Sequence, residues 1–101
     1  MFRVYRTLDE IGAEARNCAV SIGNFDGVHA AHRRILRRVV QLGQEQGWTP
    51  SVLTFHPHPS KILAPDRAPK LLTSLEERLS YIRAEGIQQA FVLYYIPVLQ
   101  V

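Results

Sequence analysis

The strongest constraint on the fold of this chain is a short apolar strand that runs directly into a glycine-bounded loop and then a long amphipathic helix. Residues 18–22, Cys-Ala-Val-Ser-Ile, are apolar or small and partly β-branched, which is typical of a strand buried in a parallel sheet. Residues 23–27, Gly-Asn-Phe-Asp-Gly, form the loop, and residues 30–46 repeat apolar side chains at helical spacing. This order predicts a βα unit and hence an α/β fold.

The rest of the chain alternates between strand-like and helix-like segments in the same way. We expect a short strand over residues 2–5, a weak helix over 8–15, a strand over 51–55, a helix from Ser74 to about 85 and a strand over 90–95. Such alternation predicts a parallel sheet with right-handed crossovers and flanking helices. The expected fold class is therefore α/β and Rossmann-like, with only the first half of a doubly wound sheet present.

Both long helices carry boundary signals and an apolar stripe. Thr73 or Ser74 can cap the second helix, and Ser74-Leu-Glu-Glu has the spacing of a capping box. Gly47 and Gly86 can end the two helices. The residues expected to face the core are Ile35, Leu36, Val39, Val40 and Leu42 in the first helix and Leu75, Leu79 and Ile82 in the second.

Composition and charge limit the class of protein. A chain of 101 residues supports one small domain, and its formal net charge of +3 favours anionic partners. Cys18 is the only cysteine, so no intrachain disulfide forms and a reducing compartment fits. The most apolar run, 90–101, is shorter than the roughly 20 residues that span a bilayer, and the amino terminus lacks a secretory leader. We therefore expect a cytoplasmic protein without a membrane partner.

Two histidines stand where the helix after the loop begins. His29 and His32 are three residues apart, so both imidazoles share one helical face. The first turn also has backbone N–H groups without an intrahelical acceptor and the positive end of the helix dipole. Gly23 allows a tight exit from the strand, and Gly27 lets a ligand approach the backbone. The pattern predicts a phosphate site, and the alternative is that both histidines are ordinary helix-start residues.

The residues between the two glycines each have two interpretations. Asn24 can donate to a phosphate oxygen or accept from a metal-bound water. Asp26 can cap the helix or bind water around Mg²⁺, and capping is the more frequent role. Phe25 can stack on a base or bury its ring to anchor the loop.

The other two histidines follow the next strand. His56 and His58 lie in Thr-Phe-His-Pro-His-Pro, residues 54–59, where two prolines fix the backbone and extend the residues before them. Loops after neighbouring parallel strands meet at the carboxyl edge of the sheet, where ligands bind. We therefore expect all four histidines at one edge, with the proline segment as one wall of a pocket. The alternatives are a merely rigid connection and histidines exposed on surface loops.

Several other kinds of site are disfavoured. The sequence has neither Gly-x-Gly-x-x-Gly nor a Walker loop, which argues against dinucleotide redox chemistry and P-loop hydrolysis. No carboxylate or cysteine stands at ligand spacing from the histidines, so we expect no protein-bound metal, and the less favoured alternative is zinc held by His29, His32, His56 and His58. Nucleic acid ranks last as a partner, because the aromatic residues form no stacking platform. The basic residues of the long helix indicate a solvated face, with a contact to triphosphate as the alternative: Arg33, Arg34, Arg37 and Arg38.

Four segments in a fixed order carry a resemblance to a known family. They are Gly-Asn-Phe-Asp-Gly-Val-His with a second histidine at 32, Thr-Phe-x-Pro-His-Pro (54–59), Ala-Pro-Asp-Arg-Ala-Pro-Lys (64–70) and Leu-Thr-Ser-Leu-Glu-Glu-Arg-Leu (72–79). From Phe2 to about Leu93 the chain resembles the N-terminal adenylyltransferase module of bacterial bifunctional riboflavin kinase/FAD synthetases. That module belongs to the nucleotidyltransferase superfamily with a His-x-Gly-His signature.

The resemblance implies transfer of AMP from ATP to FMN, giving FAD and pyrophosphate with Mg²⁺ and without a covalent enzyme intermediate. It implies that His29 and His32 hold the triphosphate and stabilise its transition state, as catalytic residues together with Asn24. The remaining loop residues would line the nucleotide site: Gly23, Phe25, Asp26 and Gly27. The flavin side would be formed by Pro57, His58 and Pro59.

The chain also departs from the family pattern. Ala31 replaces the glycine that is usual in the signature, and His56 stands where the family often has an acidic residue. The family continues with a second half-sheet and a riboflavin kinase barrel. We expect residues 1–101 to be a partial adenylyltransferase domain without the kinase domain. The open edge of a half-sheet predicts self-association, and a nucleotide-binding remnant without catalysis is the alternative function.

Overall fold

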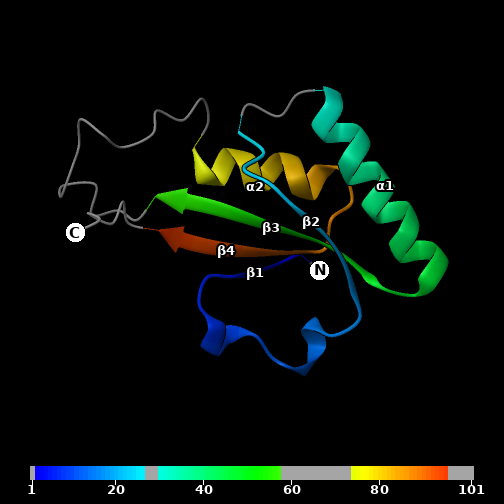
Figure 1. Ribbon diagram of the computed structural model, residues 1–101, viewed down its shortest axis with the longest axis horizontal. Helices are drawn as coiled ribbons and strands as arrows, with labels where there is room; N and C mark the ends of the chain where they lie inside the picture. The colour runs from blue at the N-terminus through cyan, green and yellow to red at the C-terminus, as the bar shows by residue number, and fades with distance from the viewer. Residues whose placement is uncertain (1, 27–29, 58–73, 96–101) are drawn as a thin grey trace, which may run out of the picture.

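Parallel strands from both ends of the chain form one sheet (Figure 1). The computed structural model describes residues 2–26, 30–57 and 74–95, and within these ranges four strands lie in the order β1-β4-β3-β2. The elements are β1 (Arg3–Tyr5), the 3₁₀ turns η1 (Leu8–Glu10) and η2 (Ala13–Ala15), β2 (Cys18–Ile22), α1 (Ala30–Gln46), β3 (Thr49–Pro57), α2 (Leu75–Ala84) and β4 (Gln89–Tyr95). Each of the three strand pairs is parallel, which confirms the predicted α/β fold.

The register of β3 decides which loops become neighbours. β3 pairs with β2 on one side and with β4 on the other. Ile22, the last residue of β2, lies opposite Leu53, whereas β3 continues to Pro57. The chain that leaves β2 therefore emerges beside the last part of β3, at the carboxyl edge of the sheet.

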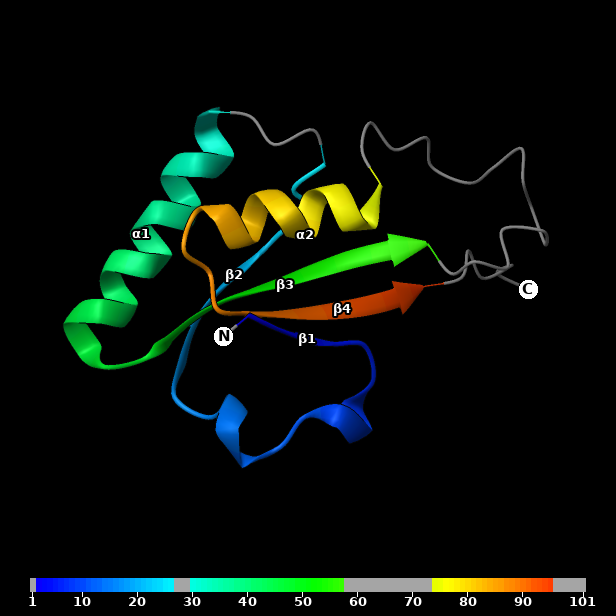
Figure 2. The ribbon, with the colours of Figure 1, turned by 180° about the vertical axis from the view of Figure 1, so that it is seen from behind.

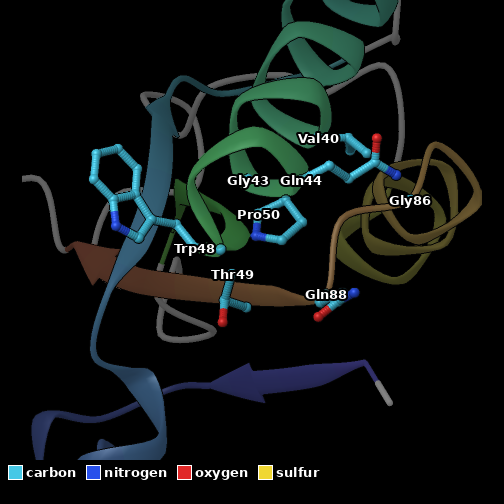
Figure 3. Close-up of a pocket in the computed structure, with 9 residues that line it drawn as sticks. Val40, Gly43, Gln44, Trp48, Thr49, Pro50, Gly86 and Gln88 are labelled. Carbon is cyan, nitrogen blue, oxygen red and sulfur yellow. The ribbon is translucent and has the colours of Figure 1, made fainter.

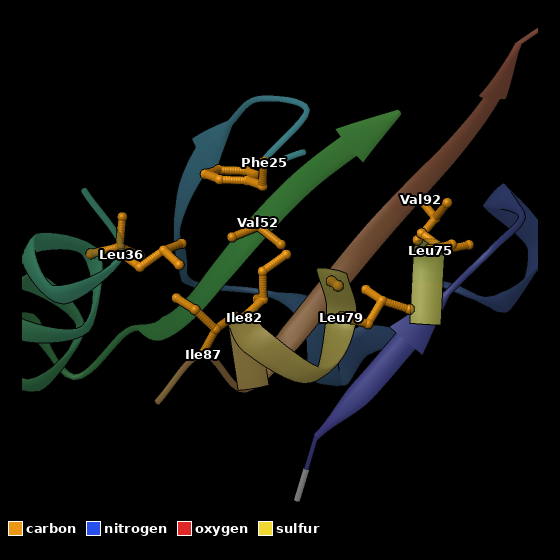
Figure 4. Close-up of a cluster of buried hydrophobic side chains, with 10 residues drawn as sticks. Phe25, Leu36, Val52, Leu75, Leu79, Ile82, Ile87 and Val92 are labelled. Carbon is orange, nitrogen blue, oxygen red and sulfur yellow. The ribbon is translucent and has the colours of Figure 1, made fainter. Parts of the chain in front are cut away.

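Both helices lie on the same face of the sheet (Figures 1 and 2). Between them and the strands is one buried apolar cluster (Figure 4): Phe25, Leu36, Val39, Val52, Leu75, Leu79, Ile82, Ile87, Ala90 and Val92. Full burial of a large apolar side chain stabilises a fold by about 1.5–3 kcal/mol. This cluster is therefore the main force that holds α1 and α2 against the sheet.

The predicted limits of the main elements are largely confirmed. α1 covers the predicted 30–46 and β2 the predicted 18–22. Ser74 caps α2 as expected, because its Oγ accepts from the backbone N–H of Glu77 at 3.0 Å while its own N–H donates to the Glu77 carboxylate at 3.3 Å. β3 and β4 are longer than predicted, since their ladder continues beyond the apolar runs.

The weak helix predicted for residues 8–15 is wrong. The segment forms two separate 3₁₀ turns. The carboxylate of Glu10 accepts from the backbone N–H groups of Arg6 at 2.8 Å and Thr7 at 2.9 Å, which ties the first turn back on the residues before it. Gly12, between the two turns, has an extended backbone that ends the first before the second begins.

One residue of the stripe predicted for α1 is also misplaced. Ile35 is 44% exposed, whereas Leu36, Val39 and Gly43 are buried. Neighbouring helical residues point about 100° apart. The side chain next to Leu36 therefore turns out of the contact with the sheet.

The sheet face opposite the helices is only partly covered by the described residues. Tyr5 stacks on Phe91 with ring centroids 5.4 Å apart, and its hydroxyl donates to Glu14 at 3.1 Å. Burial raises the pKa of Tyr5, and the backbone N–H of Glu14 together with the Tyr5 hydroxyl lowers the pKa of Glu14. Val20 and Ile22 of β2 are exposed. β1 and β2 are the two edge strands of the described sheet, and self-association through such an edge stays a prediction.

A glycine within α1 is required by the turn that follows the helix. A Cβ on Gly43 would lie 2.6 Å from the carbonyl oxygen of Trp48 and 3.1 Å from Cδ of Pro50 (Figure 3). Gly43→Ala should lower the free energy of unfolding by about 1–3 kcal/mol through overpacking, although the change stabilises an exposed helix by about 1 kcal/mol. Urea denaturation followed by circular dichroism measures this. Gln44→Ala is the exposed control, and a Gly43→Ala variant of unchanged stability would contradict the contact.

Candidate functional site

The loop after β2 is fastened to the carboxyl end of β3. The backbone N–H of Gly23 donates to the carbonyl of Leu53 at 3.0 Å, which adds one bond beyond the β2–β3 ladder. The carbonyl of Asn24 accepts from the hydroxyl of Thr54 at 3.1 Å and from Arg78 at 2.7 Å. These bonds hold the loop across the end of the neighbouring strand, where the sequence predicts the site.

Phe25 anchors the same loop through its buried ring. Its φ of 54° lies in the left-handed region, which residues other than glycine rarely adopt. Its side chain is 3% exposed, and a Cβ on Gly23 would lie 3.3 Å from its ring. The ring packs edge-on against His32, with centroids 5.5 Å apart. This packing fits the loop anchor rather than a platform for a base.

The structure describes part of the predicted phosphate site. Asn24 is exposed at the loop, Asp26 is half-buried, and His32 is half-buried in the first turn of α1. Gly27 and His29 lie outside the described residues. The strand–loop–helix unit thus brings Asn24, Asp26 and His32 to one edge of the sheet.

The site also contains a buried arginine that the sequence analysis did not identify. Arg78 of α2 has no exposed surface. Besides the carbonyl of Asn24, its Nη1 donates to the carbonyl of Phe55 at 3.1 Å and lies 3.4 Å from the hydroxyl of Thr54. Its Nη2 lies 2.7 Å from Nδ1 of His56. One guanidinium therefore joins the loop, the end of β3 and α2.

The spacing of residues in α2 indicates that Arg78 is buried. Leu75, Leu79 and Ile82 are buried, as the sequence predicts. Arg78 lies three residues after Leu75 and four before Ile82, so it belongs to the same stripe. A charged residue within an apolar stripe indicates a buried hydrogen-bonding role, because an unpaired buried charge is strongly destabilising.

The proline segment is described only where it continues β3. His56 is half-buried, and its ring lies edge-on to Tyr94 with centroids 6.1 Å apart. Pro57 is the last residue of β3, and His58 and Pro59 lie outside the described residues. The end of β3 therefore lies beside the loop after β2, as expected for neighbouring parallel strands.

Two arginines of α1 pair with the residue that follows α2. The Nε atoms of Arg33 and Arg37 lie 3.8 Å and 3.3 Å from the carboxylate oxygens of Glu85. Both arginine side chains remain more than half exposed, so each pair contributes about 0–1 kcal/mol. The basic face of α1 is mainly solvated, as predicted, and these two arginines reach toward the carboxyl end of α2.

The described residues contain neither a cluster of metal-binding side chains nor a helix that could cross a membrane. Among residues 2–26, 30–57 and 74–95, no three His, Cys, Asp or Glu side chains come close enough together to hold a metal ion. In the same part of the chain, no helix has the length and apolar character needed to cross a membrane. What the sheet edge does offer is backbone groups, amide and imidazole, which suit an anionic ligand.

A pocket of about 470 Å³ lies at the opposite end of the sheet (Figure 3). It is lined by the end of α1, the start of β3 and the turn before β4, including Gly43, Trp48, Pro50 and Gly86. None of the described residues that line it carries a charge or an imidazole. It lacks groups that could stabilise phosphate charge, so the carboxyl edge is the better candidate.

The sheet order and the glycine loop at its carboxyl edge place the chain among α/β proteins with a Rossmann-like parallel sheet. Sequence comparison then identifies the family. The profile of the FAD synthetase family matches residues 11–99, and the chain belongs to this family.

Curated relatives align over most of this chain. The bifunctional riboflavin kinase/FMN adenylyltransferase of Bacillus subtilis (strain 168) is 37% identical over 86 residues, which is 84% of this chain and 27% of that protein. The protein of the same name from Escherichia coli (strain K12) is 39% identical over 75 residues, 74% of this chain and 24% of that one. The Pseudomonas fluorescens protein of the same name is 33% identical over 93 residues, which is 92% of this chain and 30% of that protein. The chain therefore spans less than a third of the length of these relatives.

A solved structure shows the same fold. The crystal structure of a macrolide-efflux protein from Streptococcus pneumoniae superposes with a TM-score of 0.65 and 19% sequence identity. The match covers 96% of this chain and 33% of that one. At this identity the likeness concerns the fold alone.

Thr54 tests how strongly β3 holds the loop. Its buried hydroxyl donates to the carbonyl of Asn24, and valine has nearly the same shape without a donor. Thr54→Val should lower the free energy of unfolding by about 1 kcal/mol, because the partly buried carbonyl of Asn24 loses one of its two donors and keeps Arg78. Thr49→Val, at the other end of β3, is the matched control for urea denaturation. Equal stability of Thr54→Val and the parent chain would show that this bond does not hold the loop.

Proposed function

We propose that this chain forms part of an FMN adenylyltransferase domain, which transfers AMP from ATP to FMN and gives FAD and pyrophosphate. The family match and the names of the relatives support this assignment. The observation that carries it is the loop of residues 23–26, tied to the end of β3 immediately before α1. That place in a parallel sheet is where α/β proteins bind phosphate groups.

The proposed reaction depends on positioning and on charge stabilisation. An oxygen of the FMN phosphate attacks the α-phosphorus of Mg-ATP, a new P–O bond forms, and the bond to the β-phosphate oxygen breaks with release of pyrophosphate. Charge shifts onto the oxygens around the α-phosphorus and onto the leaving group. His29 and His32 would donate to these oxygens, and Asn24 with the loop backbone would hold the nucleotide.

The flavin acceptor, the magnesium ion and the cell compartment complete the proposed function. The segment from Pro57 through His58 and Pro59 would bind the flavin side, since in the sequence it follows residues 53–56 of β3, and this part of β3 lies beside the loop after β2. Mg²⁺ would enter with ATP as part of the substrate. The reaction would take place in the cytoplasm, where Cys18 remains a thiol. Small nucleotides are the partners we propose.

Formation of FAD by the purified, folded chain tests this function. FMN and Mg-ATP should give FAD, and His32→Asn or His29→Asn should each lower the rate by about 10²-fold or more, because each removes a donor to the transition state. Chromatography of the products measures the rate.

Arg38→Gln provides the matched control for the charge of α1. Arg38 is exposed and donates to Gln41 on the same helix, so its replacement should leave FAD formation nearly unchanged. Binding of Mg-ATP without any FAD would rule out catalysis by this chain and favour the nucleotide-binding remnant.

A further inference from the structure

A fully buried guanidinium requires a physical reason. Arg78 has no exposed surface, and arginine stays charged under all physiological conditions. Removing a charge from water is costly unless hydrogen bonds replace its hydration. A hydrophobic residue of similar volume commonly serves the core as well as a buried charge does. The specific contribution of Arg78 therefore lies in the groups that it holds.

One of its bonds fixes a peptide unit of the loop. Nη1 lies 2.7 Å from the carbonyl oxygen of Asn24, and the Thr54 hydroxyl donates to the same oxygen at 3.1 Å. The C=O and N–H of a trans peptide point in opposite directions, and the described residues contain no cis peptide bond. Because the Asn24 C=O turns toward Arg78 and β3, the N–H of Phe25 points away from them. The φ of 54° at Phe25 is part of this uncommon turn.

The other terminal nitrogen of Arg78, Nη2, contacts the imidazole ring of His56. A guanidinium has donors and no acceptor, so Nδ1 of His56 must accept from Nη2 at 2.7 Å. In the neutral imidazole the proton then sits on Nε2, which becomes the donor. The ring is also held edge-on against Tyr94. Arg78 thus sets the orientation and the proton position of a histidine at the carboxyl edge.

We propose that Arg78 is a positioning residue of the nucleotide site, which directs the Phe25 N–H toward a phosphate group and keeps His56 as an Nε2–H donor. The identity of the ligand, a nucleoside triphosphate, rests on the proposed function, whereas the two contacts of Arg78 do not. Arg78 is fully buried and acts through these two groups. Without its guanidinium the carbonyl of Asn24 keeps only the longer bond from Thr54, so the Asn24–Phe25 peptide is less firmly held and the N–H loses part of the fixed direction that a phosphate site needs.

Nuclear magnetic resonance of the isotope-labelled chain, alone and with Mg-ATP, tests the proposal. We expect the Nε2–H tautomer of His56 before nucleotide is added, and a downfield shift of the Phe25 amide proton on binding. Arg78→Met keeps an unbranched side chain but removes the donors. It should weaken Mg-ATP binding by about tenfold or more, mix the His56 tautomers and abolish the shift of Phe25.

Ile82→Val is the matched control for packing, because Ile82 is fully buried one turn along α2. It should reduce stability while changing the affinity for Mg-ATP by less than about twofold. Arg78→Lys is the replacement test if Arg78→Met does not fold. One ammonium group cannot hold both Asn24 and His56, so the tautomers of His56 should again mix.

Two results would overturn the proposal. They are an Nδ1–H tautomer of His56 in the parent chain, and an unchanged affinity for Mg-ATP in folded Arg78→Met. If the parent chain binds no Mg-ATP, the proposed function fails together with the ligand, while the His56 tautomer still reports separately on the contacts of Arg78.

Discussion

The parallel pairing of β3 with β2 and β4 determines where chemistry can occur in this chain. Parallel strands bring ends of the same polarity to one edge, so the loop after β2 and the end of β3 meet there. That edge carries Asn24, His32 and His56, whereas the opposite end has a pocket lined by uncharged residues of the turn around Gly43 and Trp48. An antiparallel β2–β3 pair would have put the two loops at opposite ends of the sheet.

The loop at this edge is held by groups that belong to the core. Thr54 and Arg78 are fully buried, and both donate to the carbonyl of Asn24. The ring of Phe25 packs between Gly23 and His32. A site that is fastened by buried residues keeps its shape before the ligand arrives, so less conformational entropy is lost on binding. This explains why a charged residue occupies the apolar stripe of α2.

Features that depend on nearby residues could be predicted from the sequence, and contacts between distant residues could not. The limits of α1 follow from its periodicity, and the Ser74 capping box is complete within four residues. The turns at 8–15 escaped prediction because the carboxylate of Glu10 bonds to the preceding backbone, which helical spacing does not reveal. Arg78 bonds to a carbonyl 54 positions away, and no spacing rule connects the two. Its place in the stripe shows only that it is buried.

Titration of the isotope-labelled chain with Mg-ATP, followed through its backbone amide spectrum, tests most directly where a nucleotide binds. The account predicts that the shifts gather at residues 23–26, 30–32 and 54–56, at the carboxyl edge of the sheet. Amides around Trp48 and Gly86 should stay where they are. Shifts concentrated around Trp48 and Gly86 would place the nucleotide in the pocket at the opposite end and contradict the account.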